Sequence, residues 1–254
     1  MKDRYGFTLI EMSVALVVIA LLAAGVTVGR ELIETAKLRA TVTQYEQFKT
    51  AANGFRLKYG VLPGDLYAAK AATFGMTPRA GTAGRGDGNQ KLTACGSYEN
   101  PMNLTQLECE GAMFWNDLSY AKLIPGDYSR NLDDDFSIVP GAIHLTLPAA
   151  KISGVYFTLT SEFLDTVKGI YDPYSFALVA AQGDADEPRS YGALATIPCS
   201  SVLYLDSKID DGNTGTGKIH TKKRQKGSGA GGTIMGLPTC DNPNALVSGL
   251  SLGQ

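Results

Sequence analysis

An unbroken run of apolar residues near the N-terminus constrains this chain more than any other feature. From Phe7 to Gly29 there are 23 residues, and Glu11 is the only charged one. At about 1.5 Å of rise per residue, a helix of this length measures roughly 35 Å, which is enough to cross a hydrocarbon core of about 30 Å. The run is also longer than the apolar part of an ordinary signal peptide, which has about 7–15 residues. The sequence therefore predicts a membrane-spanning helix.

The charges around this run predict its orientation. Lys2 and Arg4 precede it and are only partly offset by Asp3, and positive residues favour the cytoplasmic side of a membrane. We therefore expect a cytoplasmic N-terminus and export of everything after the span. The net charge of the whole chain is −2, which gives no general attraction to nucleic acid. Nucleic acid is not expected as a partner.

Glu11 has two interpretations on physical grounds. An acid in the first turn of a helix is favoured by the helix dipole. Alternatively, a carboxylate in an apolar span costs about 2.5–3.5 kcal/mol at the bilayer centre on insertion scales, so it calls for a partner of opposite charge. Both interpretations remain open at this level.

The residues Gly6-Phe7-Thr8-Leu9-Ile10-Glu11, after a short charged leader, closely resemble the N-terminal signal of the type IV pilin and pseudopilin family. The resemblance implies that a prepilin peptidase cuts between Gly6 and Phe7 and methylates the new amine of Phe7. It also implies that Glu11 pairs with the N-terminal amine of a neighbouring subunit during assembly. Opposite charges about 4 Å apart attract by roughly 4 kcal/mol at an effective dielectric constant of about 20.

The helix is expected to continue beyond the membrane as an amphipathic one. Past Arg30 charged residues interrupt the run, but an apolar stripe at helical spacing survives; it consists of Leu38, Val42, Tyr45, Phe48, Ala52, Phe55 and Tyr59. Gly60 and Pro63 are stop signals. One helix is therefore predicted over residues 7–60, with 7–29 in the membrane. Many main filament subunits of the family carry a proline where this chain has Val28, and its absence favours a minor pilin or a pseudopilin.

Residues 61–254 are expected to form the exported globular domain after a cleaved leader at residues 1–6. Val61 to Asn100 is predicted to be a connection, with a turn at Leu62–Asp65 and a flexible loop at Gly81–Gly88. A short amphipathic helix is predicted at Ala112–Lys122, and strands are predicted around Ile143–Leu147, Val155–Leu159, Tyr174–Ala181 and Val202–Leu205. The predicted class is α+β and pilin-like, with the long helix packed on an antiparallel sheet.

Four cysteines lie in the exported part, where an oxidising compartment favours disulfides. They allow three pairings. Nearest neighbours would pair as Cys95–Cys109 and Cys199–Cys240, each contributing about 3–4 kcal/mol in the chain-entropy model. The second would bound a C-terminal loop, as in many pilins. Free thiols or a metal site are the alternatives.

Candidate ligands for a metal ion gather in one acidic, glycine-rich segment. Asp206, Asp210, Asp211 and Asn213 offer the oxygen atoms that calcium prefers, since calcium takes about 6–8 such ligands. The segment loosely resembles the C-terminal calcium loop of the major pseudopilins, and a polar turn without an ion is the alternative. No cofactor is required, and calcium is the one candidate.

Other polar segments have simpler interpretations. Asp87–Asn89 and Asp133–Asp135 are interpreted as turns rather than metal ligands. The basic segment Lys222–Lys226 is interpreted as a solvated loop, with contact to DNA, an acidic substrate or a partner pilin as the alternatives. His144 and His220 belong to no recognisable catalytic motif. No catalytic residues are predicted, and the protein is not expected to be an enzyme.

The predicted function is that of a structural subunit in a type IV pilus-like filament. The alternatives are a pseudopilin of a type II secretion system and, in another class, a signal-anchored periplasmic enzyme or binding protein. Expected partners are further copies or other pilin subunits, prepilin peptidase, the inner-membrane assembly machinery and the membrane itself. The expected location is the bacterial inner membrane with a single pass, and after assembly a surface filament or a periplasmic pseudopilus.

Overall fold

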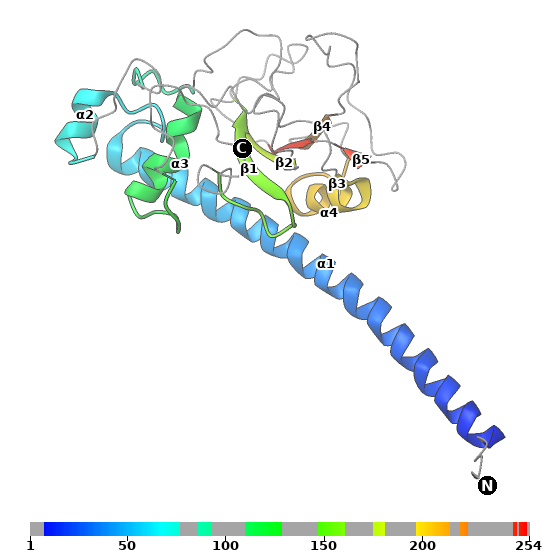
Figure 1. Cartoon of the computed structure of the whole chain (residues 1–254). Coiled ribbons are helices and arrows are strands. Elements are labelled where there is room, and N and C mark those ends of the chain that lie inside the picture. Colours follow the sequence, from blue (N-terminus) through cyan, green and yellow to red (C-terminus); the bar gives the residue numbers. More distant parts are fainter. Residues whose placement is uncertain are drawn as a thin grey trace, which may run out of the picture.

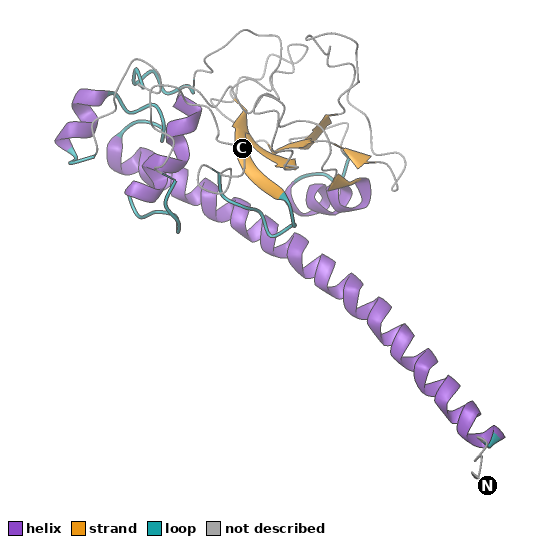
Figure 2. Cartoon of the chain, in the orientation of Figure 1, coloured by secondary structure: helices purple, strands orange, loops and turns teal. Residues whose placement is uncertain are grey.

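The computed structural model is a long helix with a mixed domain built around its C-terminal half (Figure 1). It describes residues 8–76, 86–92, 110–128, 147–160, 175–180, 197–213, 219–222, 246–247 and 249–252. Figure 2 shows the helices and strands of the domain gathered at one end of the helix, while the other end projects away from them.

The long helix α1 runs from Leu9 to Tyr59 and has 51 residues, roughly 77 Å at about 1.5 Å per residue. It ends at Gly60, whose φ of 71° lies in the left-handed region. The Gly60 N–H donates to the Arg56 carbonyl oxygen at 2.8 Å, so a glycine cap closes the last turn. The prediction of one continuous helix through Val28, ending at Gly60, is confirmed.

In the part of the chain that the structure describes, α1 is accompanied by three shorter helices: α2 (Ala68–Thr73), α3 (Glu110–Tyr120) and α4 (Cys199–Ile209). Helix α3 agrees with the helix predicted at Ala112–Lys122, shifted by two residues. The described part of the chain after α1 begins with the predicted turn, in which the Asp65 N–H donates to the Leu62 carbonyl oxygen at 3.1 Å.

Within the described residues, six strands form two antiparallel sheets. The larger sheet has the order β1-β2-β6-β4, and the smaller pairs β3 with β5. Their bounds are β1 Val155–Thr160, β2 Ser175–Ala180, β3 Ile197–Pro198, β4 Ile219–Lys222, β5 Leu246–Val247 and β6 Gly249–Leu252. Phe157 lies opposite Leu178 in the register of β1 and β2, and both side chains are buried. One face of this pair of strands therefore faces the core.

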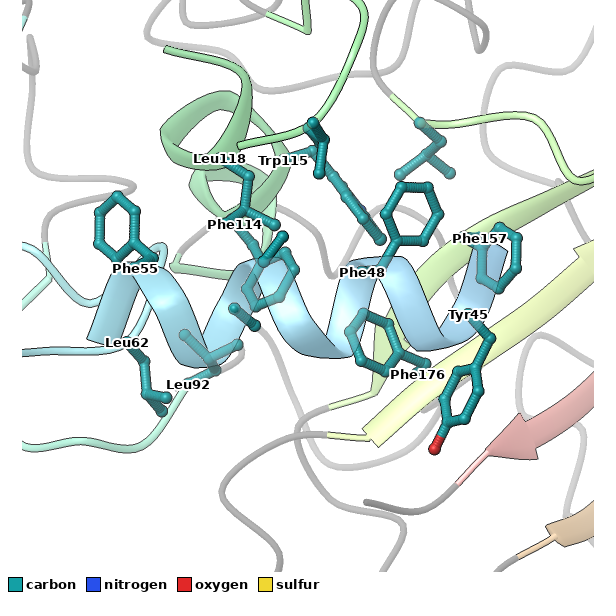
Figure 3. Packing of buried hydrophobic residues seen from close by; sticks show 14 of the residues in the cluster. Tyr45, Phe48, Phe55, Leu62, Leu92, Phe114, Trp115, Leu118, Phe157 and Phe176 are labelled. Atoms are coloured by element: carbon teal, nitrogen blue, oxygen red, sulfur yellow. The ribbon is translucent and has the colours of Figure 1, made fainter. Parts of the chain in front are cut away.

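The core lies where α1, α3, β1 and β2 meet, and it is rich in aromatic rings (Figure 3). The ring of Phe48 on α1 packs edge-on against Trp115 and Phe157, with centroids 4.9 and 5.0 Å apart. Tyr45 packs edge-on against Phe176 at 5.7 Å. Such pairs add about 0.5–1.5 kcal/mol each to the gain from burial. The predicted apolar stripe is confirmed as the face of α1 that enters the core, with Leu38 and Val42 packed at its edge.

One prediction for the domain was wrong, and one helix was not predicted. Val202–Leu205 is not a strand but part of α4, in which Val202 and Leu205 are buried three residues apart on one helical face. A short apolar run does not distinguish a buried strand from a buried helix. The connection after α1 also contains α2, whose alanine-rich sequence has high helix propensity. The pilin-like class of the domain as a whole stays a prediction.

Candidate functional site

A reciprocal cap holds the start of α1. The Thr8 N–H and the Thr8 hydroxyl both donate to Glu11 Oε2, at 2.8 and 2.7 Å. In return the Glu11 N–H donates to Thr8 Oγ1 at 3.3 Å. This arrangement is a capping box, in which two otherwise unpaired donors of the first turn are satisfied. The helix-start interpretation of Glu11 is confirmed, and its pairing with a second subunit stays a prediction.

The N-terminal half of α1 is exposed along its whole apolar surface. Leu9, Ile19 and Leu32 are 89%, 65% and 65% exposed, and the first buried residue of the helix is Thr41. An 18-residue window of this helix has a mean hydropathy of 2.5 with none of it buried. By length and composition it is the one described helix that could cross a membrane, a test that signal sequences also pass.

An acidic cluster lies at the C-terminal end of α4, and we call it the α4 acidic cluster. It consists of Asp206, Asp210 and Asp211, whose carboxylate oxygens lie within 4.8 Å of one another. Asp206 is 0% exposed. Neither of its carboxylate oxygens accepts a hydrogen bond of good geometry, although the Gly212 backbone N–H is close enough to lower its pKa. Asn213, which was predicted as a fourth ligand, donates its backbone N–H to Asp211 Oδ1 at 2.8 Å. The structure thus brings together the three predicted aspartates.

The surroundings of Asp206 are unfavourable for a negative charge. Burial, followed by the charges of Asp211 and Asp210, raises the pKa of Asp206 from 3.8 to about 6, although the backbone amide of Gly212 lowers it. The C-terminal end of a helix also carries the negative end of the helix dipole. A cation at this place would relieve all three effects.

A second acidic cluster was not predicted from the sequence. Asp65, Asp87 and Glu110 also have carboxylate oxygens within 4.8 Å of one another. Asp65 is fully buried, and it accepts hydrogen bonds from the backbone N–H groups of Gly88 and Gln90 at 2.7 and 2.6 Å. Burial raises the pKa of Asp65, and these two amides oppose that change.

This second cluster organises a loop rather than leaving unpaired groups. Asp87 Oδ1 accepts the Asn89 N–H at 2.9 Å, so the predicted turn at Asp87–Asn89 is confirmed. Glu110 Oε1 accepts the Asp87 N–H at 3.3 Å. The members are too far apart in the sequence for a spacing signal. From the sequence, only the turn at Asp87–Asn89 could be predicted.

Cys199 at the start of α4 is buried and disulfide-bonded. The other three cysteines lie outside the described residues. The pairings Cys95–Cys109 and Cys199–Cys240 therefore stay predictions.

Comparison with known families gives one match. The family described as Prokaryotic N-terminal methylation motif matches residues 1–27, which include the cap and most of the apolar run. The chain carries a prepilin-type N-terminal signal. Neither the curated proteins nor the solved structures contain a match to the chain.

The prepilin-type signal supports a type IV pilin-like or pseudopilin subunit that is processed by prepilin peptidase. The signal and the exposed apolar helix are together consistent with a single-pass anchor in the inner membrane. Proteins with this signal assemble into a filament with membrane machinery, and the match does not distinguish between filament systems.

Several predicted residues lie outside the part of the chain that the structure describes. These are the cleavage-site residues Gly6 and Phe7, His144, the Asp133–Asp135 segment and most of the basic segment that begins at Lys222. His220 belongs to β4. The capping box could also have been predicted from the sequence, because Thr8-x-x-Glu11 has the spacing of that motif.

Proposed function

We propose that this protein is a structural subunit of a type IV pilus-like filament, cut after Gly6 and assembled through the N-terminal half of α1. One observation carries the proposal: the prepilin-type signal leads directly into a single helix whose first half is exposed and whose second half packs into the domain. The proposed role is structural rather than enzymatic.

The physical support lies in the exposed apolar surface between Leu9 and Ile33. Burial of apolar surface is worth roughly 25 cal/mol per Å², so a helix with this surface requires lipid or other helices around it. Before assembly the lipid bilayer can supply that environment. After assembly the N-terminal halves of α1 from neighbouring subunits can supply it. The domain is held at a fixed distance from this region because α1 has no break.

Glu11 is proposed to change partners during this transfer. In the single chain its carboxylate accepts both donors of Thr8. A carboxylate can accept further hydrogen bonds, so an N-terminal amine of a neighbouring subunit can join or replace the Thr8 donors. The cap keeps the charge satisfied in the membrane until that amine arrives.

Mass spectrometry of the N-terminus of the chain isolated from its native membrane tests the processing step. A mature chain beginning at N-methylated Phe7 is expected. An intact Met1, or a cut near residue 24, would contradict the proposal.

Substitution of Glu11 tests the assembly step and separates the charge from the cap. Glu11→Gln keeps an oxygen that accepts from Thr8 but removes the charge, whereas Glu11→Ala removes both. Both variants are expected to insert and be processed, and to be depleted from isolated filaments at least tenfold. Glu31→Gln, on an exposed part of α1 beyond the apolar run, is the matched control. Filaments of Glu11→Gln that equal the wild type in amount would rule out charge pairing.

A pseudopilin of a type II secretion system is the second candidate. Two observations favour it: α1 continues through Val28 without a proline, and the α4 acidic cluster lies in the segment that loosely resembles the calcium loop of the major pseudopilins. Imaging of isolated fibres distinguishes the two candidates, because long surface filaments are expected only for a pilus subunit.

A further inference from the structure

Two cations and one tyrosine meet where α4 lies beside α1. Arg39 Nε on α1 donates to the Tyr204 hydroxyl on α4 at 3.1 Å, and Lys208 Nζ lies 5.7 Å from the centre of the Tyr204 ring. Both cations are exposed. The side chain that they share is neutral, so it cancels neither charge. We call these three residues the α4 basic site.

The α4 basic site lies at the end of the domain from which the exposed half of α1 projects (Figure 1). Ile33 is the last large exposed apolar residue of that half, and Arg39 follows about 9 Å further along the helix axis. The polar layer of a bilayer extends roughly 5–7 Å beyond the hydrocarbon core on each side. Long side chains on a helix also lean toward its N-terminus, which here is toward the membrane. The Arg39 guanidinium is therefore expected at the level of the lipid headgroups when the apolar half spans a membrane.

The charges between the apolar half and the domain favour an anionic partner. Residues 30–39 of α1 carry three cations and two acids. Of the acids, Glu34 lies four residues after Arg30 and three before Lys37, within reach of both on the helix surface. Lys208 adds one more cation from α4. This stretch and Lys208 together therefore carry an excess of positive charge.

The α4 acidic cluster lies on other sides of the helix. Tyr204 and Lys208 are four residues apart and share one face of α4. Asp206 is two residues from each of them, which turns it by about 200° around the helix axis, and it is buried. Asp210 is likewise two residues from Lys208, and Asp211 comes after the end of the helix. The face of α4 that carries Tyr204 and Lys208 is thus distinct from the acidic one.

We propose that the α4 basic site binds the phosphate group of an anionic lipid in the leaflet next to the domain, and that this contact holds the domain on the membrane surface before assembly. Arg39 and Lys208 supply the charge. Tyr204 holds the two cations together, and its amphipathic ring suits a membrane interface. A lipid is favoured over a free anion because α1 itself brings the site to the headgroups. This inference rests on the membrane anchor of the proposed function and not on the filament.

Amide hydrogen exchange of the full chain in lipid nanodiscs tests the proposal. The discs contain phosphatidylcholine alone, or phosphatidylcholine and phosphatidylglycerol at a molar ratio of about 2:1. Each Lys or Arg close to an anionic surface contributes roughly a fivefold preference for that surface. Exchange of the α4 amides is therefore expected to be at least about fivefold slower in the anionic discs. Exchange in α3, at the other end of the domain, is expected to be the same in both.

Substitutions of the two cations separate lipid binding from structure, and the readout is the ratio of α4 exchange rates in neutral and anionic discs. Arg39→Gln and Lys208→Gln are each expected to lower this ratio by roughly fivefold. Arg39→Lys keeps the charge and is expected to keep most of the ratio. A loss of the contact between Arg39 and Tyr204 that acts only on the fold would speed exchange equally in both discs and leave the ratio unchanged.

Lys58→Gln combined with Lys70→Gln is the matched control. These lysines lie over tyrosine rings in the same way, with Nζ 4.9 and 5.9 Å from the ring centres. Lys58 is roughly 37 Å beyond Ile33 along α1, which is out of reach of the headgroups. The control is expected to show the ratio of the wild type.

Three results would overturn the proposal. Equal α4 exchange in neutral and anionic discs would show that this surface does not bind anionic lipid. An equal fall of the ratio in the control variant would assign the effect to the overall charge of the domain. Full protection of α4 in neutral discs by millimolar inorganic phosphate would make the site one for free anions. A failure of filament assembly would leave these rates unchanged, because they are measured on the single subunit.

Discussion

The two halves of α1 are one helix with opposite surroundings. From Leu9 to Ile33 its large apolar side chains are exposed, whereas from Thr41 to Tyr59 its apolar stripe is buried under the domain. The backbone geometry does not change between them. The difference teaches that the sequence assigns each half its environment through side chains alone: apolar all round in the first half, and apolar on one face in the second.

This contrast also separates two kinds of stability. The second half is stabilised within the chain by packing against α3, β1 and β2. The first half has no packing partner among the described residues, so its surface is stabilised only by what surrounds the protein. The effect of a substitution in the second half should therefore be measured by unfolding of the domain, and that of a substitution in the first half by membrane insertion.

The largest expected effect is the loss of stability when a core side chain of the second half of α1 is removed. Phe48→Ala removes a ring that contacts Trp115 and Phe157, and it should lower the free energy of unfolding of the domain by about 3–5 kcal/mol. Leu16→Ala, in the exposed half, should leave that free energy unchanged. Denaturant unfolding of the full chain in micelles, followed by Trp115 fluorescence, measures both. An equal loss in the two variants would contradict the division.

A charge placed in the exposed half should act only on the membrane. Ile19→Arg is expected to cost about 2.5–3.5 kcal/mol in membrane insertion, because it places a cation at the centre of the apolar run. Thr43→Arg, at an exposed position beside the domain, is the control. Membrane fractionation and alkaline extraction of cells expressing each variant measure the effect. Full membrane retention of Ile19→Arg would show that the run does not lie in lipid.

The domain half should also be the half that responds to pH, through Asp65. Because burial raises its pKa in the folded state above the ordinary 3.8, the folded state binds the proton more tightly. Stability from this group is then highest at low pH and falls as the pH rises from 3.8 through the raised pKa.

Asp65→Asn provides the matching variant. Asparagine can accept only one of the two backbone N–H bonds of Asp65 without presenting a donor to the other, so a loss of about 1–3 kcal/mol is expected. The difference in free energy of unfolding between the wild type and Asp65→Asn should become smaller as the pH rises from 3.8 through the raised pKa of Asp65. Urea unfolding of both proteins at several pH values measures this difference. If it becomes larger as the pH rises, the pKa of Asp65 is lowered on folding and not raised.

The smallest expected effects concern the two glycines near the domain end of α1. Gly60→Ala forces a side chain into a φ of 71°, which should cost about 1–2 kcal/mol. Gly54 lies inside the helix with nothing within 4 Å of an added Cβ, so Gly54→Ala should stabilise by about 0.5–1 kcal/mol. Thermal unfolding of both variants should show midpoints that move in opposite directions.

The sequence predicted α1 well because its signals are local. The spacing of Tyr45, Phe48 and Phe55 identifies the buried face, and Gly60 marks the end. Helix α3 and strands β1 and β2 were predicted for the same reason. Each has several apolar residues at the period of its element.

The errors and omissions have physical causes as well. Val202–Leu205 was too short a run for its period to be read, and its helix became visible only with Cys199 one turn earlier. The carboxylates of Asp65 and Glu110 lie close together because the chain returns after 45 residues, and no local pattern records that return. By contrast, Asp206, Asp210 and Asp211 are neighbours on one helix end, so their grouping was predictable. The burial of Asp206 was not.

The unbroken course of α1 fixes an angle as well as a length. A helix advances about 1.5 Å and turns about 100° with each residue, so the number of residues between Ile33 and Leu38 sets the direction in which the domain points relative to the exposed apolar surface. One inserted residue would swing the domain by about 100°, whereas seven would return it to within about 20° while moving it roughly 10 Å outward. The charged stretch between the two halves therefore acts as a setting for the rotational phase of the domain.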